Sequence, residues 1–88
     1  MAGLLRRRTP VQVVTLVTRQ GCHLCEEAAP LVARAAAAAG ARYEEREVDA
    51  SPADLLAYSD KVPVVLLDGV EHAFWQIDEP ALRRALKG

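Results

Sequence analysis

The first half of the chain contains an apolar run followed by a helical pattern. Residues 11–18 are rich in β-branched side chains and almost continuously apolar, which is typical of a central strand covered on both faces. Residues 19–21 interrupt this run. From Cys22 to Ala39 apolar residues recur at helical spacing, and Gly40 follows in the position where glycine commonly ends helices. The pattern predicts a buried strand and then an amphipathic helix.

The next segment predicts an edge strand and a short helix. Residues 42–49 are mostly polar, as expected for a strand at the side of a sheet. Ser51 then offers a hydroxyl cap, Pro52 suits the first helical position, and Asp54 is an acid in the first turn. We expect this helix to end near Tyr58.

The last third of the chain predicts a hairpin and a final helix. Residues 62–67 form a second strongly apolar run, and Asp68-Gly69 is a two-residue hairpin signal before a return strand at 70–75. Asp78 can then cap a helix over residues 79–87.

These elements follow the order β-α-β-α-β-β-α. The first two strands are joined through a helix, so they should be parallel with a right-handed crossover. The last two should form an antiparallel hairpin. The compact solution is an α/β three-layer sandwich in which helices cover both faces of a mixed four-stranded sheet.

Composition limits the chain to one small core. It has 88 residues, of which 51% are hydrophobic, so we expect one domain over residues 11–88 after a frayed tail at 1–10. Eleven Lys and Arg against twelve Asp and Glu give no basic bias, so no nucleic-acid partner is expected. No apolar run approaches the roughly 18 residues that span a bilayer, and no signal-like apolar segment follows the basic residues near the start. We therefore expect a cytoplasmic protein with no membrane partner.

Cys22 and Cys25 form the most informative pattern in the sequence. One bridge over so short a segment would stabilise little, so a C-x-x-C pair in a reducing compartment indicates metal ligation or redox chemistry. Free N–H groups and the dipole at a helix start stabilise a thiolate, so we expect the pKa of Cys22 to fall below the free value of about 8.5. Cys25 should be more buried. This asymmetry suits Cys22 as the nucleophile and Cys25 as the resolving thiol.

The residues between the cysteines and the other histidine leave alternatives open. A protonated His23 would add positive charge near Cys22, or it could simply face solvent; Leu24 would close the site from water, or simply pack. Structural zinc needs four ligands, and His23 could hardly share an ion with both flanking sulfurs, which leaves His72 as the one further histidine. We expect no metal site within one chain. An iron–sulfur cluster or metal ion shared by two chains stays the alternative.

Residues 18–25, Thr-Arg-Gln-Gly-Cys-His-Leu-Cys, resemble the active-site segment of glutaredoxins, where glycine commonly precedes the first cysteine. Val62-Pro63 resembles the segment that holds a cis proline beside the active site in the thioredoxin superfamily, and Pro30 resembles the proline of its active-site helix. The resemblance covers residues 11–86. It implies a glutaredoxin-type thioredoxin-like fold and a dithiol–disulfide oxidoreductase that reduces protein or small-molecule disulfides, with Cys22 attacking and Cys25 resolving.

The resemblance also implies where substrate would bind. Pro63 would be the cis proline, and Val62 would offer its backbone to an extended substrate. Arg19 or Lys61 would supply the basic residue that glutaredoxins place near the cysteines. The candidate substrate-binding residues are Arg19, His23, Leu24, Lys61, Val62 and Pro63.

One segment departs from the glutaredoxin pattern. Enzymes that bind glutathione usually carry a Gly-Gly pair after the last strand, where this chain has Trp75-Gln76, and we expect Trp75 to pack as a strand residue. The electron donor is left open between glutathione, another low-molecular-weight thiol and a reductase. We expect no bound cofactor and a monomer. A non-catalytic thioredoxin-fold adaptor is the further alternative function.

Overall fold

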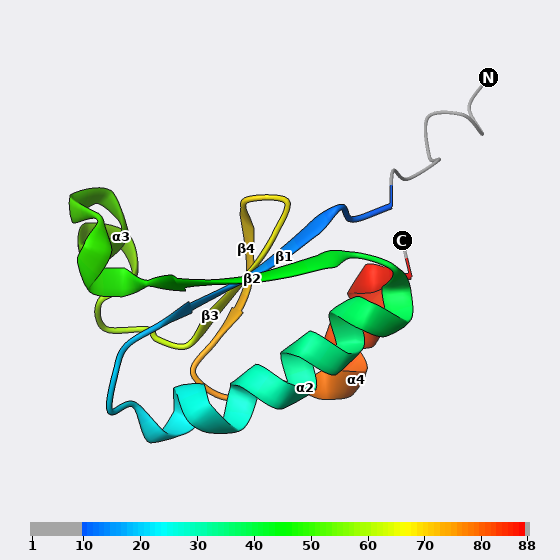
Figure 1. Cartoon of the computed structure of the whole chain (residues 1–88), viewed down its shortest axis with the longest axis horizontal. Coiled ribbons are helices and arrows are strands. Elements are labelled where there is room, and N and C mark those ends of the chain that lie inside the picture. The colour runs from blue at the N-terminus through cyan, green and yellow to red at the C-terminus, as the bar shows by residue number, and fades with distance from the viewer. Residues whose placement is uncertain (1–9, 88) are drawn as a thin grey trace.

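The computed structural model describes residues 10–87, so the expected tail at 1–10 lies outside the described residues except for Pro10. The elements follow the predicted order (Figure 1). They are β1 (Val13–Thr18), α2 (His23–Ala39), β2 (Arg42–Glu47), the 3-10 turn η1 (Val48–Ala50), α3 (Pro52–Tyr58), β3 (Val64–Leu67), β4 (Val70–Phe74) and α4 (Glu79–Leu86).

The four strands form one mixed sheet in the order β2-β1-β3-β4. β1 runs parallel to β2 and antiparallel to β3, and β3 and β4 form an antiparallel hairpin. The predicted mixed four-stranded sheet is therefore confirmed. In the β1–β3 pair Val17 lies opposite Val64, so the end of β1 and the start of β3 meet at the same edge of the sheet. This register places the loop after β1 beside the loop before β3.

Alternate residues of β1 face two different cores. Val14 and Leu16 pack under α2 and α4 with Val32 and Leu82, and all four side chains are fully buried. The neighbouring Val17 points the other way. It packs with three further buried residues and two half-buried ones: Val48, Val64, Leu66, Tyr58 and Val62. Figure 1 shows α2 and α4 side by side on one side of the sheet, with α3 toward one end of the molecule.

Local signals fix most of the boundaries. Ser51 and Asp78 accept hydrogen bonds from the backbone N–H groups of Asp54 and Ala81, as expected for helix caps. Gly40 ends α2 with a positive φ of 75°. The edge strand predicted at 42–49 is two residues shorter in the structure, where β2 ends at Glu47. The fully buried Val48 begins the 3-10 turn η1 instead.

None of the helices within residues 10–87 has the length and apolar character that crossing a membrane requires.

The contact that fastens α3 to the sheet gives a prediction on stability. Arg46 of β2 donates two hydrogen bonds to the Asp54 carboxylate, at 2.8 and 3.1 Å, and this bonding raises the pKa of Arg46 above its usual value. Asp54→Ala should lower the free energy of unfolding by about 1 kcal/mol, because Asp54 is buried while Arg46 is partly hydrated. Urea denaturation measures the change. Asp60→Ala, at an exposed carboxylate, is the control and should change stability by less than about 0.5 kcal/mol; equal losses in both variants would contradict the explanation.

Candidate functional site

The site begins at the first residue of the helix that follows β1. Cys22 is the N-cap of α2, with φ −91° and ψ 109°. Its sulfur accepts a hydrogen bond from the backbone N–H of Cys25 at 3.2 Å, and its carbonyl accepts one from Glu26 at 3.1 Å. The sulfur therefore occupies the place that a Ser or Asp oxygen takes at an ordinary N-cap, next to N–H groups that have no partner inside the helix.

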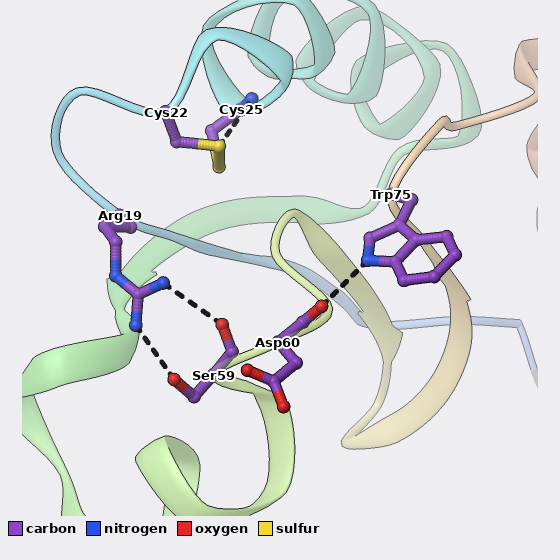
Figure 2. Close-up of a disulfide and its surroundings, with 6 residues drawn as sticks. All are labelled: Arg19, Cys22, Cys25, Ser59, Asp60 and Trp75. Atoms are coloured by element: carbon purple, nitrogen blue, oxygen red, sulfur yellow. Dashed lines mark hydrogen bonds between the residues drawn. A yellow bond between two sulfur atoms is a disulfide. The ribbon is translucent and has the colours of Figure 1, made fainter.

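Cys22 and Cys25 are joined as a disulfide, with their Cα atoms 5.2 Å apart (Figure 2). The two residues differ in exposure: Cys25 is buried, at 4% exposed, whereas Cys22 is half-buried. The expected greater burial of Cys25 is confirmed. The lowered pKa of the reduced Cys22 thiol stays a prediction.

Gly21 makes the turn that leads into the helix. Its φ is +77°, in the left-handed region that side chains with a Cβ rarely adopt. A Cβ at this position would meet no atom within 4 Å among the described residues. The glycine is therefore required by the backbone conformation and not by lack of space.

Val62 and Pro63 lie at the same edge of the sheet as the cysteines, because β3 begins opposite the end of β1. The peptide bond between them is cis. Pro63 is buried and Val62 is half-buried. The registered pairs of β3 begin only at Val64, so both residues precede the β1–β3 ladder.

Arg19 connects the loop before Cys22 to the loop after α3. Its guanidinium donates hydrogen bonds to the carbonyl and to the hydroxyl of Ser59, both at 3.1 Å (Figure 2). It also lies 3.5 Å from a carboxylate oxygen of Asp49. These contacts hold the two loops together. The binding role expected for Arg19 stays a prediction, and any substrate would have to share a side chain that already has partners.

The other two charged candidates also have partners. His23 has a side chain that is 83% exposed and lies 3.1 Å from Glu27, one turn along the helix. Of the two placements that the sequence left open for His23, beside Cys22 or facing solvent, the structure has the second. Lys61 lies 3.3 Å from Glu71 and 5.1 Å from the centre of the Phe74 ring. Both side chains are reachable, and their binding roles stay predictions.

A family model described as Glutaredoxin-like domain (DUF836) matches residues 13–87. The chain belongs to this family. It is 37% identical over 75 residues to Uncharacterized protein Rv0508 of Mycobacterium tuberculosis (strain ATCC 25618 / H37Rv), a match that covers 80% of this chain and 77% of that protein.

Two solved structures are similar to this glutaredoxin-like domain. The structural-genomics target protein XcR50 from X. campestris matches with a TM-score of 0.68 and 32% identity, over 84% of this chain and 95% of that one. A mutant thioredoxin from Halobacterium salinarum NRC-1 matches with a TM-score of 0.63 and 26% identity, over 85% of this chain and 71% of that one. Together with the strand order, these matches confirm the thioredoxin-like fold.

Trp75 is the residue of this glutaredoxin-like site that sequence reasoning misplaced. The expectation that it packs as a strand residue is wrong: β4 ends at Phe74, and Trp75 has a positive φ of 63° and is 53% exposed. Its backbone N–H donates to the carbonyl of Pro63 at 2.9 Å, and its indole N–H donates to that of Asp60 at 2.9 Å (Figure 2). The signal in the sequence was its position, because the glutaredoxin pattern that the chain resembles has a Gly-Gly pair here.

Two open grooves adjoin the start of α2. The first, of about 450 Å³, lies between α2 and the segment after β4; Leu24 lies in its apolar lining, and Trp75 borders it. The second, of about 410 Å³, contains Cys25 and lies between α2, the loop after β1 and the end of β2. Leu24 is thus half-buried beside a groove, so it neither fully closes the site nor packs only in the core.

The donor groups of a metal site are not assembled in the described chain. Within residues 10–87, no three His, Cys, Asp or Glu side chains lie together as they would around one ion. His72 lies on β4, in the outer strand of the hairpin.

The conformation of Gly21 yields a prediction for the loop that carries Cys22. Gly21→Ala should lower the free energy of unfolding by about 1 kcal/mol, because a Cβ is disfavoured at this positive φ even where space is open. Gly21→Asn should lose less, since asparagine tolerates the left-handed region better than other non-glycine residues. Urea denaturation of the three oxidised proteins measures both changes. If the alanine and asparagine variants lose the same stability, the backbone explanation is wrong.

Proposed function

We propose that this chain is a dithiol–disulfide oxidoreductase that reduces disulfides through Cys22 and Cys25. One observation carries the proposal: the sulfur of the half-buried Cys22 caps α2 and accepts a hydrogen bond from the N–H of Cys25, and the buried Cys25 lies close enough to form a disulfide with it. A backbone N–H aimed at sulfur favours the thiolate, which is the nucleophile in thiol–disulfide exchange. Membership of the glutaredoxin-like family supports the same class of activity.

The reaction starts from the reduced protein. The Cys22 thiolate attacks one sulfur of the substrate disulfide and forms a mixed disulfide with it; the substrate S–S bond breaks, and the other substrate sulfur leaves as a thiolate that takes up a proton. The Cys25 thiol then loses its proton and attacks the Cys22 sulfur of the mixed disulfide, which releases the second substrate thiol. The substrate has gained two electrons and two protons, and the protein has become the Cys22–Cys25 disulfide. An external thiol or a reductase returns two electrons to the protein.

In this proposal the substrate binds at the edge of the sheet where the loop after β1 lies beside the loop before β3. Val62 precedes the β3 ladder and would pair through its backbone with an extended segment next to the substrate disulfide. Pro63 packs beneath this segment. Leu24 would contact the substrate from the helix side. Both cysteines belong to one chain, so one chain can perform both steps and the proposed unit is a monomer. This chain needs no bound cofactor. Its electrons come from glutathione, another low-molecular-weight thiol or a reductase.

Cysteine replacements test the division of roles. Cys22→Ser should reduce the rate of disulfide reduction at least about 100-fold, because no nucleophile remains at the helix start. Cys25→Ser should still attack but fail to resolve, so mass spectrometry should detect a mixed disulfide on Cys22. Undiminished turnover by Cys22→Ser would end the proposal.

The ionisation of Cys22 tests the physical basis. In reduced Cys25→Ser protein only Cys22 can be alkylated, and the pH dependence of the iodoacetamide rate reports its pKa. We expect a value below the free-cysteine value of about 8.5, because the thiolate is stabilised at the N-cap and the thiol is not. At neutral pH this variant should therefore react faster than Cys22→Ser, in which the buried Cys25 is the remaining thiol. A midpoint at or above that of free cysteine would contradict the argument.

A further inference from the structure

The first groove, whose lining includes Leu24 from the segment between the two cysteines, combines aliphatic, aromatic and acidic residues. Its floor is aliphatic, made by Leu24, Leu31 and Ile77. Trp75 also lines this groove; about half of the residue is exposed, and its ring N–H donates a hydrogen bond to the backbone carbonyl of Asp60. The groove is open to solvent and has a volume of about 450 Å³.

The polar rim of the same groove is acidic. Glu27 and Asp78 contribute carboxylates, and no Lys or Arg is among its described lining residues. Asp78 uses one oxygen, Oδ1, to cap α4 through Ala81. Glu27 lies 3.1 Å from the exposed His23. Both carboxylates stand at the surface, where a bound cation could reach them.

An aliphatic floor, an indole face and two carboxylates are the complementary surface for one chemical type of side chain. The methylene stem of lysine or arginine packs on apolar surface while its charged end seeks anions. Tryptophan is also the aromatic ring that attracts such cations most strongly.

The second groove adds negative charge on the other side of Cys25. It is lined by Glu26, Glu45 and Glu47, and Arg19 is the one basic residue among its described lining. The guanidinium of Arg19 is hydrogen-bonded to Ser59 and faces Asp49. The charged residues that line the two grooves are therefore predominantly anionic, although the whole chain is nearly neutral.

We propose that the redox site prefers peptide disulfides flanked by lysine or arginine, with one such side chain lying in the groove between Leu24, Glu27, Trp75 and Asp78. This inference rests on the proposed reduction of disulfides and names its substrate class. The acidic surface steers the cationic segment toward Cys22, and the groove holds the side chain beside the substrate sulfur. Oxidised glutathione, with its exposed carboxylates, fits this surface poorly.

Three peptide disulfides test the preference. They are symmetric dimers that differ only in the residues flanking the cysteine, which are lysine, serine or glutamate. The reduced protein is mixed with each one, and the released peptide thiol is followed in a single turnover. Each rate is divided by the rate of the same peptide with dithiothreitol, which removes differences in intrinsic reactivity.

At low salt the normalised rate should be about tenfold higher for the lysine peptide than for the glutamate peptide, with serine between them. At about 0.5 M salt this ratio should fall to about twofold, because screening weakens the attraction. Equal normalised rates for all three peptides would overturn the inference while leaving the reductase intact. Failure to reduce any of them would instead overturn the proposed function.

Charge-removing variants test the groove itself. Glu27→Gln and Asp78→Asn should each lower the lysine-to-glutamate ratio about twofold to threefold, and asparagine keeps the helix cap. The matched control is Glu44→Gln, which removes the same charge from β2 at a side chain that hydrogen-bonds Thr15 and lines neither groove. It should leave the ratio unchanged. If Glu44→Gln lowers the ratio as much as the groove variants, net charge and not the groove explains the preference, and the inference is wrong.

Discussion

The hydrogen bond from the Cys25 N–H to the Cys22 sulfur is the contact on which the candidate chemistry depends. It exists because β1 ends in a left-handed turn at Gly21 and the helix begins directly afterwards. The same bond fixes which sulfur faces outward. Cys22 occupies the cap and is half-buried, whereas Cys25 lies in the first turn and is buried. Backbone geometry therefore distinguishes the proposed nucleophile from the proposed resolving thiol.

The sheet supplies the second constraint. Antiparallel pairing of β1 with β3 brings Val62 and Pro63 to the edge where Cys22 lies, although forty residues separate them in the chain. Trp75 joins this edge because its N–H donates to the carbonyl of Pro63. Arg19 then ties the loop before Cys22 to Ser59, just upstream of Val62. Three loops are thus held in one arrangement by backbone pairing and a few directed hydrogen bonds.

Much of this could be predicted from the sequence, and the failures have a common cause. The helix stop at Gly40, the caps at Ser51 and Asp78, and the order of helices and strands along the chain follow from local patterns, so the sequence predicts them. The partners of Arg19 and the exposure of Trp75 depend on contacts between distant segments. Trp75 was misplaced for a further reason: a tryptophan after a strand usually packs, whereas here the chain turns with a positive φ at that residue. Its backbone adopts a conformation that glycine favours, and the residue lines the groove between α2 and the segment after β4.

The acidic groove residues would disfavour the proposed Cys22 thiolate but would attract a cationic substrate, and these two effects act over different distances. Glu26 and Glu27 disfavour a nearby thiolate, but both are exposed, so water and salt weaken their effect. The N–H of Cys25 acts on the sulfur from 3.2 Å in a half-buried position, where a directed donor counts for more. For a substrate that approaches through solvent the carboxylates matter more than the Cys25 N–H, because it interacts with them before it reaches the sulfur. Short-range donors can thus set the reactivity of Cys22 while longer-range charge selects the molecules that reach it.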